Sequence, residues 1–170
     1  ILVNSNSSRG RQHFTIAHEL FHLYYDENPK PHICSKDGTS RTERYADQFA
    51  SALLMPEEGI IGMLSDEEYA NKKISIAQVL RLEQYFCVSR STMLLRLKEL
   101  NLLSSAQYDT LKTYPVIRSA KEYGYDDSLY LSGNENLVIG DYGEKARLLF
   151  EIEKISEGHY LELLNLIQND

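Results

Sequence analysis

The sequence contains little of what stabilises secreted scaffolds or membrane proteins. Its 170 residues include two cysteines, four prolines and no tryptophan. The cysteines, Cys34 and Cys87, are far apart in the chain. Isolated thiols fit a reducing compartment better than a disulfide framework, so we expect a cytoplasmic protein. No apolar run approaches the roughly 20 residues that a membrane-spanning helix needs, and no membrane partner is expected.

An excess of basic residues is also absent. Lysine and arginine total 18 against 25 aspartates and glutamates, for a formal net charge of −7 and a pI of about 5.3. Nucleic-acid-binding proteins are usually basic over their contact surface, so direct DNA binding is not expected. A chain of this length can bury a core without a structural metal. Any metal therefore need not have a structural role.

The apolar periodicity predicts a helix-rich α+β fold. Two short apolar runs predict strands, at residues 1–4 and 136–140, and residues 65–73 read as a loop. Because the chain begins at Ile1 without a methionine, on the first apolar run, we expect preceding residues to be missing. Helices are expected over residues 11–25, 41–55, 74–86, 89–100, 105–113, 144–154 and 157–168.

One short stretch carries the strongest chemical signal. Residues 14–25 read FTIAHELFHLYY and contain His18, Glu19 and His22 as H-E-x-x-H. At about 100° per residue, histidines four apart share one helix face and can converge on one ion, with the glutamate beside that face as general base. The alternative is a buried helix with two hydrogen-bonded histidines. A random sequence of this composition would contain the pattern about 0.013 times, which favours the metal site.

A pair of acidic residues follows at helical spacing. Glu43 and Asp47 lie four residues apart in the next predicted helix, after a loop that could return the chain antiparallel. A catalytic zinc has three protein ligands and one open position, so we expect Glu43 to be the third ligand. Asp47 would accept a hydrogen bond from a ligand histidine and fix its orientation. The alternative is that both residues belong to a solvated, charged helix face.

Peptide hydrolysis is the chemistry expected of this set. Zn²⁺ with two neutral imidazoles and one carboxylate keeps about one positive charge, which lowers the pKa of a bound water to near 7. Glu19 would take the proton of that water and later pass it to the leaving amine. His32 and Cys34, in the loop between the two helices, are the next candidates if Glu43 is not a ligand. The oxyanion-stabilising group is expected among the tyrosines.

The residues around both motifs resemble the ImmA/IrrE family of metallopeptidases. Its pattern joins F-T-x-A-H-E-x-x-H to E-x-x-A-[ND]-x-F-A-x-x-L-L-M-P, and this chain has RGRQHFTIAHELFH and then ERYADQFASALLMP. The resemblance covers residues 1–56 strongly. It implies a zincin-like fold, zinc at His18, His22 and Glu43, and Glu19 as base. It further implies a gene of phages, mobile elements or bacterial genomes.

The resemblance also implies a substrate. Family members cleave helix-turn-helix repressors of the XRE type, which relieves repression, so an antirepressor role is expected. Two residues depart from the pattern: Phe21 stands where many members have glycine, and His13 where arginine is common. Either could alter packing around the helix or access to the cleft. Members usually carry a further N-terminal segment of helix and sheet, so the resemblance implies that the small N-terminal sheet of this chain is incomplete.

Residues 74–103 read as a helix-turn-helix-like segment. Six basic and two acidic residues between Lys72 and Leu103 make this stretch locally positive. The rest of the chain is acidic and would repel phosphate. We therefore favour a helical subdomain that packs on the peptidase over DNA contact, and docking of the repressor is a third possible use.

Two regions and one function follow from these patterns. We expect a zincin-like metallopeptidase core at residues 1–64 and a helical C-terminal region at 65–170. The function expected is that of a zinc metallo-endopeptidase. The alternative is a non-catalytic regulator that binds DNA or a partner protein through the helix-turn-helix-like segment.

Overall fold

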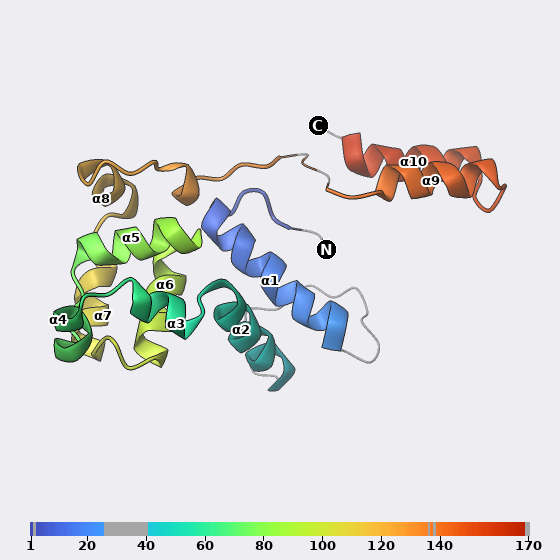
Figure 1. The fold of residues 1–170 in the computed structure, drawn as a ribbon. Coiled ribbons are helices and arrows are strands. Elements are labelled where there is room, and N and C mark those ends of the chain that lie inside the picture. The colour runs from blue at the N-terminus through green and yellow to red at the C-terminus, as the bar shows by residue number, and fades with distance from the viewer. Residues whose placement is uncertain (2, 26–40, 136, 138, 169–170) are drawn as a thin grey trace. The chain divides into compact units, whose positions relative to one another are not determined.

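The computed structural model describes residues 1, 3–25, 41–135, 137 and 139–168 (Figure 1). The chain forms two compact units, Ile1–Gly133 and Asn134–Asp170, and each is considered by itself below. The elements of the described residues are α1 (Arg9–Tyr25), α2 (Arg41–Leu54), α3 (Glu57–Gly62), α4 (Asp66–Asn71), α5 (Ile76–Phe86), α6 (Arg90–Glu99), α7 (Ser105–Lys112), α8 (Val116–Glu122), the 3-10 helix η1 (Ser128–Tyr130), α9 (Tyr142–Glu151) and α10 (Glu157–Gln168).

The fold of the described residues is all-helical, so the predicted α+β class with an N-terminal sheet is wrong. No strand occurs among these residues, and the described part of 1–4 is irregular and leads into a turn at 5–7. A strand is stable only when a neighbouring strand completes its hydrogen bonds. The second apolar run, 136–140, belongs to the other unit, and its described residues form no strand either.

The seven helices predicted from periodicity are confirmed to within a few residues. The loop predicted at 65–73 is wrong, because α4 occupies most of it. Ser65 and Glu68 form a reciprocal capping box, with Glu68 N donating to Ser65 Oγ at 3.2 Å and Ser65 N donating to Glu68 Oε2 at 2.9 Å. This S-x-x-E signal is visible in the sequence. The predicted division of the chain after residue 64 stays a prediction.

Helices α1 and α2 pack against each other through small side chains. Ala17 of α1 and Ala46 and Ala50 of α2 are buried. Small residues at a helix crossing allow the two backbones to come close. The polar side chains that flank this contact are thereby brought within reach of one another.

Helices α3, α5, α6 and α7 supply most of the main apolar core of the first unit. Serine N-caps mark the start of three of these helices. The side chains of Ser75, Ser89 and Ser104 each accept a hydrogen bond from a backbone N–H in the first turn of α5, α6 and α7. Between α5 and α6 the chain reverses at Cys87, which adopts a left-handed φ of 53°. The core residues are Met55, Ile60, Ile74, Val79, Leu82, Val88, Met93, Leu94, Leu97, Leu102, Leu103 and Leu111.

The N-terminal end of α1 is fixed to the turn between α5 and α6. A Cβ added at Gly10 would lie 2.7 Å from Ser89 N and 2.8 Å from Val88 C, so only glycine permits this approach. Close by, the His13 ring lies 2.7 Å from the carbonyl oxygen of Cys87 through Nδ1. These contacts fix the position of the N-terminal part of α1 relative to α5 and α6.

The second unit contains α9 and α10, which pack against each other. Phe150 of α9 stacks on Tyr160 of α10 with ring centroids 5.0 Å apart. Among the described residues of the chain, no helix has both the length and the apolar character needed to cross a membrane.

Candidate metal centre

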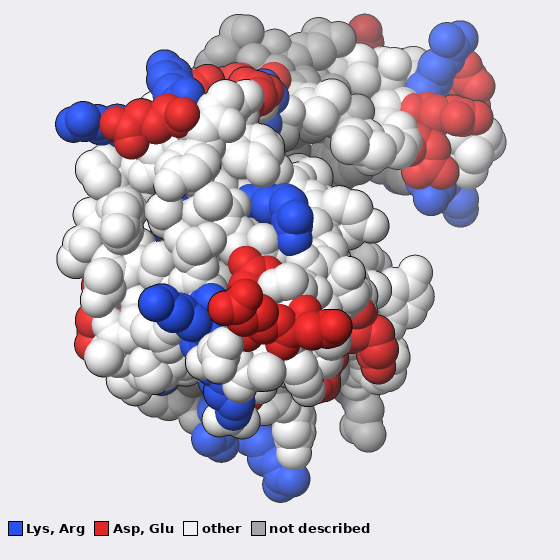
Figure 2. Space-filling view, turned by 60° about the vertical axis from the view of Figure 1, so that its left-hand side comes forward, with Lys and Arg blue, Asp and Glu red and all other residues white. Residues whose placement is uncertain are grey.

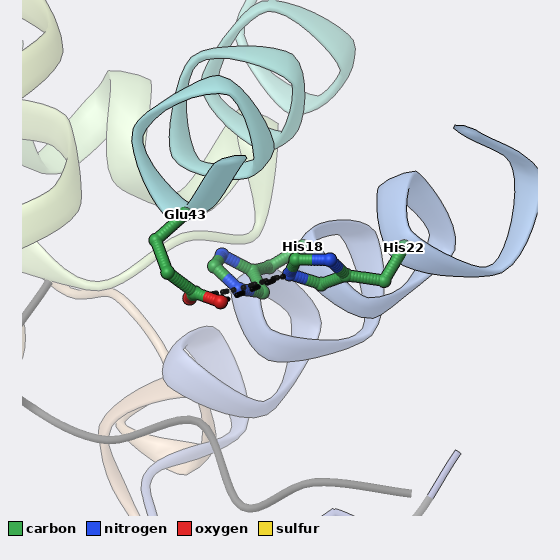
Figure 3. A group of neighbouring side chains, drawn as sticks. All are labelled: His18, His22 and Glu43. Atoms are coloured by element: carbon green, nitrogen blue, oxygen red, sulfur yellow. Dashed lines mark hydrogen bonds and ion pairs between the residues drawn. The ribbon is translucent and has the colours of Figure 1, made fainter. Parts of the chain in front are cut away.

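Three side chains from α1 and α2 converge on one point (Figure 3). His18 and His22 lie one turn apart on α1, so both rings leave the same face of the helix. Glu43 reaches them from the first turn of α2. Both histidines are buried, while Glu43 is half-buried. One ligand atom from each residue lies within 4.8 Å of the other two.

The separations between these groups are close to those required by a tetrahedral metal, with Glu43 approaching the two histidines through different carboxylate oxygens. His18 Nε2 is 3.2 Å from His22 Nε2 and 3.2 Å from Glu43 Oε2, and His22 Nε2 is 3.5 Å from Glu43 Oε1. Ligands that bind tetrahedral zinc at 2.0–2.1 Å lie about 3.3 Å apart from one another. The residues present therefore fit a metal ion of this size with three protein ligands.

The orientation of His18 is set by Asp47. The Nδ1 atom of His18 lies 2.9 Å from Asp47 Oδ1, one turn along α2 from Glu43. A neutral imidazole that donates its Nδ1–H to a carboxylate directs the lone pair of Nε2 toward the converging atoms. The hydrogen bond to Asp47 raises the pKa of His18, against the lowering effect of burial. The charges of Asp47, Glu43 and Glu19 raise it further.

Glu19 lies beside this group and is not one of the three converging residues. It is half-buried on α1, and its charge is one of the causes that raise the pKa of His18, so it is close to the centre. This placement agrees with the position expected for a general base. Its role, like that of the three candidate ligands, stays a prediction.

The two departures from the family pattern both make packing contacts. The Phe21 ring meets His22 edge-on with centroids 5.8 Å apart, and it also packs against Tyr25 and Phe49. Phe21 thereby supports one side of a candidate ligand. The other departure, His13, contacts the α5–α6 turn as described above. The loop candidates His32 and Cys34 lie outside the described residues.

The basic residues of the helix-turn-helix-like segment are partly used inside the protein. Arg90 is buried and its Nε donates to Glu83 Oε1, which is fully buried. Arg96 donates to the backbone carbonyl of Met55 at 3.1 Å. The number of basic residues in the sequence did not reveal that Arg90 and Arg96 bind groups of the protein itself. On the face shown in Figure 2, Lys and Arg side chains are scattered among acidic and uncharged ones and form no continuous basic surface.

Comparison with known proteins finds one related family. The family model of the IrrE N-terminal-like domain, peptidase M78, matches residues 1–98, which is more than half of the chain. The match spans α1 and α2, which carry the three converging side chains, and extends through most of α6. No curated protein and no solved structure shows a significant match.

Proposed function

The chain belongs to the IrrE N-terminal-like family of peptidases, and we propose that it is a zinc-dependent endopeptidase. The single observation that carries this proposal is the set of separations among His18, His22 and Glu43. The two histidine nitrogens lie 3.2 Å apart, and each lies 3.2 to 3.5 Å from one of the two Glu43 carboxylate oxygens. A catalytic zinc has three protein ligands at about such separations and an open fourth position.

Each residue then has a defined task in peptide hydrolysis. His18, His22 and Glu43 would hold the ion, and Asp47 would keep His18 in the tautomer that presents Nε2. A bound zinc supplies Lewis-acid polarisation of the scissile carbonyl and acidifies the attacking water. Glu19 would accept the proton of that water and later donate it to the leaving amine.

The substrate class is a finer part of the proposal. A peptidase family implies a protein substrate, and the resemblance to ImmA/IrrE proteins points to a DNA-binding repressor of the XRE type. The charge of this chain supports that choice. A net charge of −7 favours encounter with a basic, DNA-binding protein and disfavours approach to DNA itself.

The test is to measure zinc content and cleavage of a purified XRE-type repressor by the wild-type chain and by Glu19→Gln. We expect about one zinc per chain in both proteins. Cleavage should fall by about 10²- to 10⁴-fold in the variant, because it lacks the proton acceptor. Glu58→Gln is the matched control, because Glu58 is exposed on α3 and is not in the site. Loss of zinc in Glu19→Gln would instead make Glu19 a ligand, and absence of zinc from the wild-type chain would contradict the proposal.

A further inference from the structure

The two histidines of the converging group have neighbours of different kinds. His18 has a carboxylate beside it, since Asp47 Oδ1 lies 2.9 Å from His18 Nδ1. His22 has an aromatic ring beside it: the Phe21 ring meets it edge-on, with centroids 5.8 Å apart and planes at 83°. Aromatic rings attract each other in this geometry because the positive edge of one meets the negative face of the other. The contact with Phe21 therefore restricts the direction of the His22 ring.

Phe21 contacts α2 as well as His22. Its ring packs against Phe49 of α2 with centroids 5.8 Å apart, and it stacks on Tyr25, one turn later on α1, at 5.1 Å. Tyr25 in turn meets Phe49 at 5.8 Å. We call Phe21, Tyr25 and Phe49 the three-ring cluster. Each ring of this cluster contacts the other two, so the position of each is restricted from two sides.

The three-ring cluster spans the same two helices as the converging group. Glu43 and Phe49 both belong to the 14-residue helix α2, and they lie about 9 Å apart along its axis. A shift of α2 at Phe49 would therefore also move Glu43, because a short helix moves as a nearly rigid element. Metal sites require ligand distances within about 0.2 Å of the ideal values. Even a small rearrangement of the cluster would thus disturb the convergence of the three candidate ligands.

We propose that Phe21 is a positioning residue of the metal centre. Its ring fixes the direction of the His22 imidazole and, through Phe49, the place of the helix that carries Glu43. This role rests on the proposed function, because it requires that the converging group holds zinc. Phe21 has no atom that ligates a metal, so it acts through His22 and α2. Ligands that are already in place before the metal arrives bind it more tightly, since less order has to be imposed on binding.

A role for Phe21 in filling space alone makes a different prediction. Phe21 is half-buried, and the loss of its ring would then lower the free energy of unfolding of the zinc-free chain. The zinc affinity of the folded chain would stay the same. In a positioning role, zinc affinity falls in the folded chain, and a side chain that restores the ring restores the affinity. Zinc affinity and stability must therefore be measured separately.

The experiment is to measure the zinc dissociation constant of the full 170-residue chain by competition with a chromophoric chelator. We expect Phe21→Leu to raise this constant by about tenfold, which is the lower end of the losses seen when groups that orient a metal ligand are removed. Leucine keeps an apolar side chain and favours helix formation, so the ring is the main feature lost. Phe21→Tyr keeps the ring and should stay within about threefold of the wild-type constant.

Cobalt in place of zinc gives a second readout that does not depend on activity. The visible absorption of bound Co²⁺ follows its coordination geometry. We expect the spectrum of Phe21→Leu to differ from that of the wild-type chain and the spectrum of Phe21→Tyr to coincide with it. A loss of stability alone would leave the spectrum of the folded chain unchanged.

Phe86→Leu is the matched control. Phe86 is also half-buried, meets Tyr85 edge-on with centroids 4.9 Å apart and packs against the main apolar core. The chemical change is the same, but it lies in α5, away from the converging group. Urea denaturation of the zinc-free chain should show a loss of stability, while the zinc dissociation constant should stay within about twofold. Phe49→Leu keeps the contact of Phe21 with His22 and should raise the constant less than Phe21→Leu does.

The outcomes separate this proposal from the proposed function. An unchanged zinc dissociation constant in Phe21→Leu would overturn the positioning role and leave the zinc enzyme intact. Equal rises in Phe21→Leu and Phe86→Leu, or no recovery in Phe21→Tyr, would also overturn it. A wild-type chain that takes up no zinc would overturn both. Circular dichroism verifies that each variant keeps its helices, and Phe21→Met, whose flexible side chain fills irregular space, replaces Phe21→Leu if that variant does not fold.

Discussion

Two regions of the first unit bury polar side chains in different ways. Between α1 and α2, His18 and His22 are 8% and 4% exposed and converge with Glu43, so that three atoms able to ligate a metal lie together. Between α5 and α6, Glu83 and Arg90 are 0% and 3% exposed, and the acid and the base neutralise each other. The first arrangement suits binding of a cation, and the second suits internal packing.

The buried pair of Glu83 and Arg90 depends on a further hydrogen bond and carries a cost of burial. Oε2 of Glu83 accepts a hydrogen bond from Tyr130 Oη at 2.7 Å, and burial raises the pKa of Glu83 although Arg90 lowers it. The Nη1 and Nη2 atoms of Arg90 are buried with no hydrogen-bond partner among the described residues. The pair therefore holds α5, α6 and η1 together at a cost in solvation. Buried charge by itself does not identify a functional site; the types of atom that meet do.

The largest expected effect concerns the converging group. Glu43→Ala removes one of three candidate ligands, and zinc affinity should fall by more than about 100-fold, beyond the loss typical of residues that only orient a ligand. Metal analysis after dialysis measures this, with Glu57→Ala on α3 as control. Full zinc occupancy in Glu43→Ala would show that Glu43 is not the third ligand. The α1–α2 region would then no longer differ from the α5–α6 region by a metal site that includes Glu43.

The next effect concerns the internal pair. Glu83→Gln leaves the charge of Arg90 buried without its counterion, which should lower the free energy of unfolding by about 3–5 kcal/mol. Urea denaturation followed by circular dichroism measures it. Zinc content per folded chain should not change. If stability were kept while zinc was lost, Glu83 would belong with the metal centre.

A smaller effect is expected at Asp47. Asp47→Ala should reduce zinc affinity or activity by about 10- to 100-fold, because His18 loses the group that orients it. Asp47→Asn should lose less, since its amide oxygen can still accept the hydrogen bond from Nδ1. The Asp47 side chain is 59% exposed, so unfolding should be nearly unaffected. Equal losses in both variants would point to the charge of Asp47 and away from orientation.

The smallest effect on stability is expected at an exposed ion pair, which serves as the reference for the buried pair of Glu83 and Arg90. Arg118 Nε lies 2.8 Å from Glu122 Oε1 on α8, and both side chains are largely exposed. Arg118→Gln should change the free energy of unfolding by only about 0.3–0.5 kcal/mol. The same denaturation experiment measures it. A change as large as that of Glu83→Gln would show that burial does not separate the two pairs.

Much of the candidate site could be predicted because its key relations are local. Residues four apart share a face in any α-helix, so the pairs His18 with His22 and Glu43 with Asp47 follow from helix formation alone. The convergence of the two pairs depends on how α1 packs on α2. The sequence suggested it through spacing and resemblance, and the ligand separations required the structure.

The sequence by itself determined where most helices form and which residues can carry chemistry. The reason is that capping and apolar periodicity act within a few residues. Only the tertiary structure decided that the described residues of the first apolar run form no strand and that Arg90 is used inside the protein. A strand depends on a neighbouring strand, and the burial of a charge depends on a counterion, here Glu83 with support from the distant Tyr130. Such partners are chosen by the packing of the whole unit.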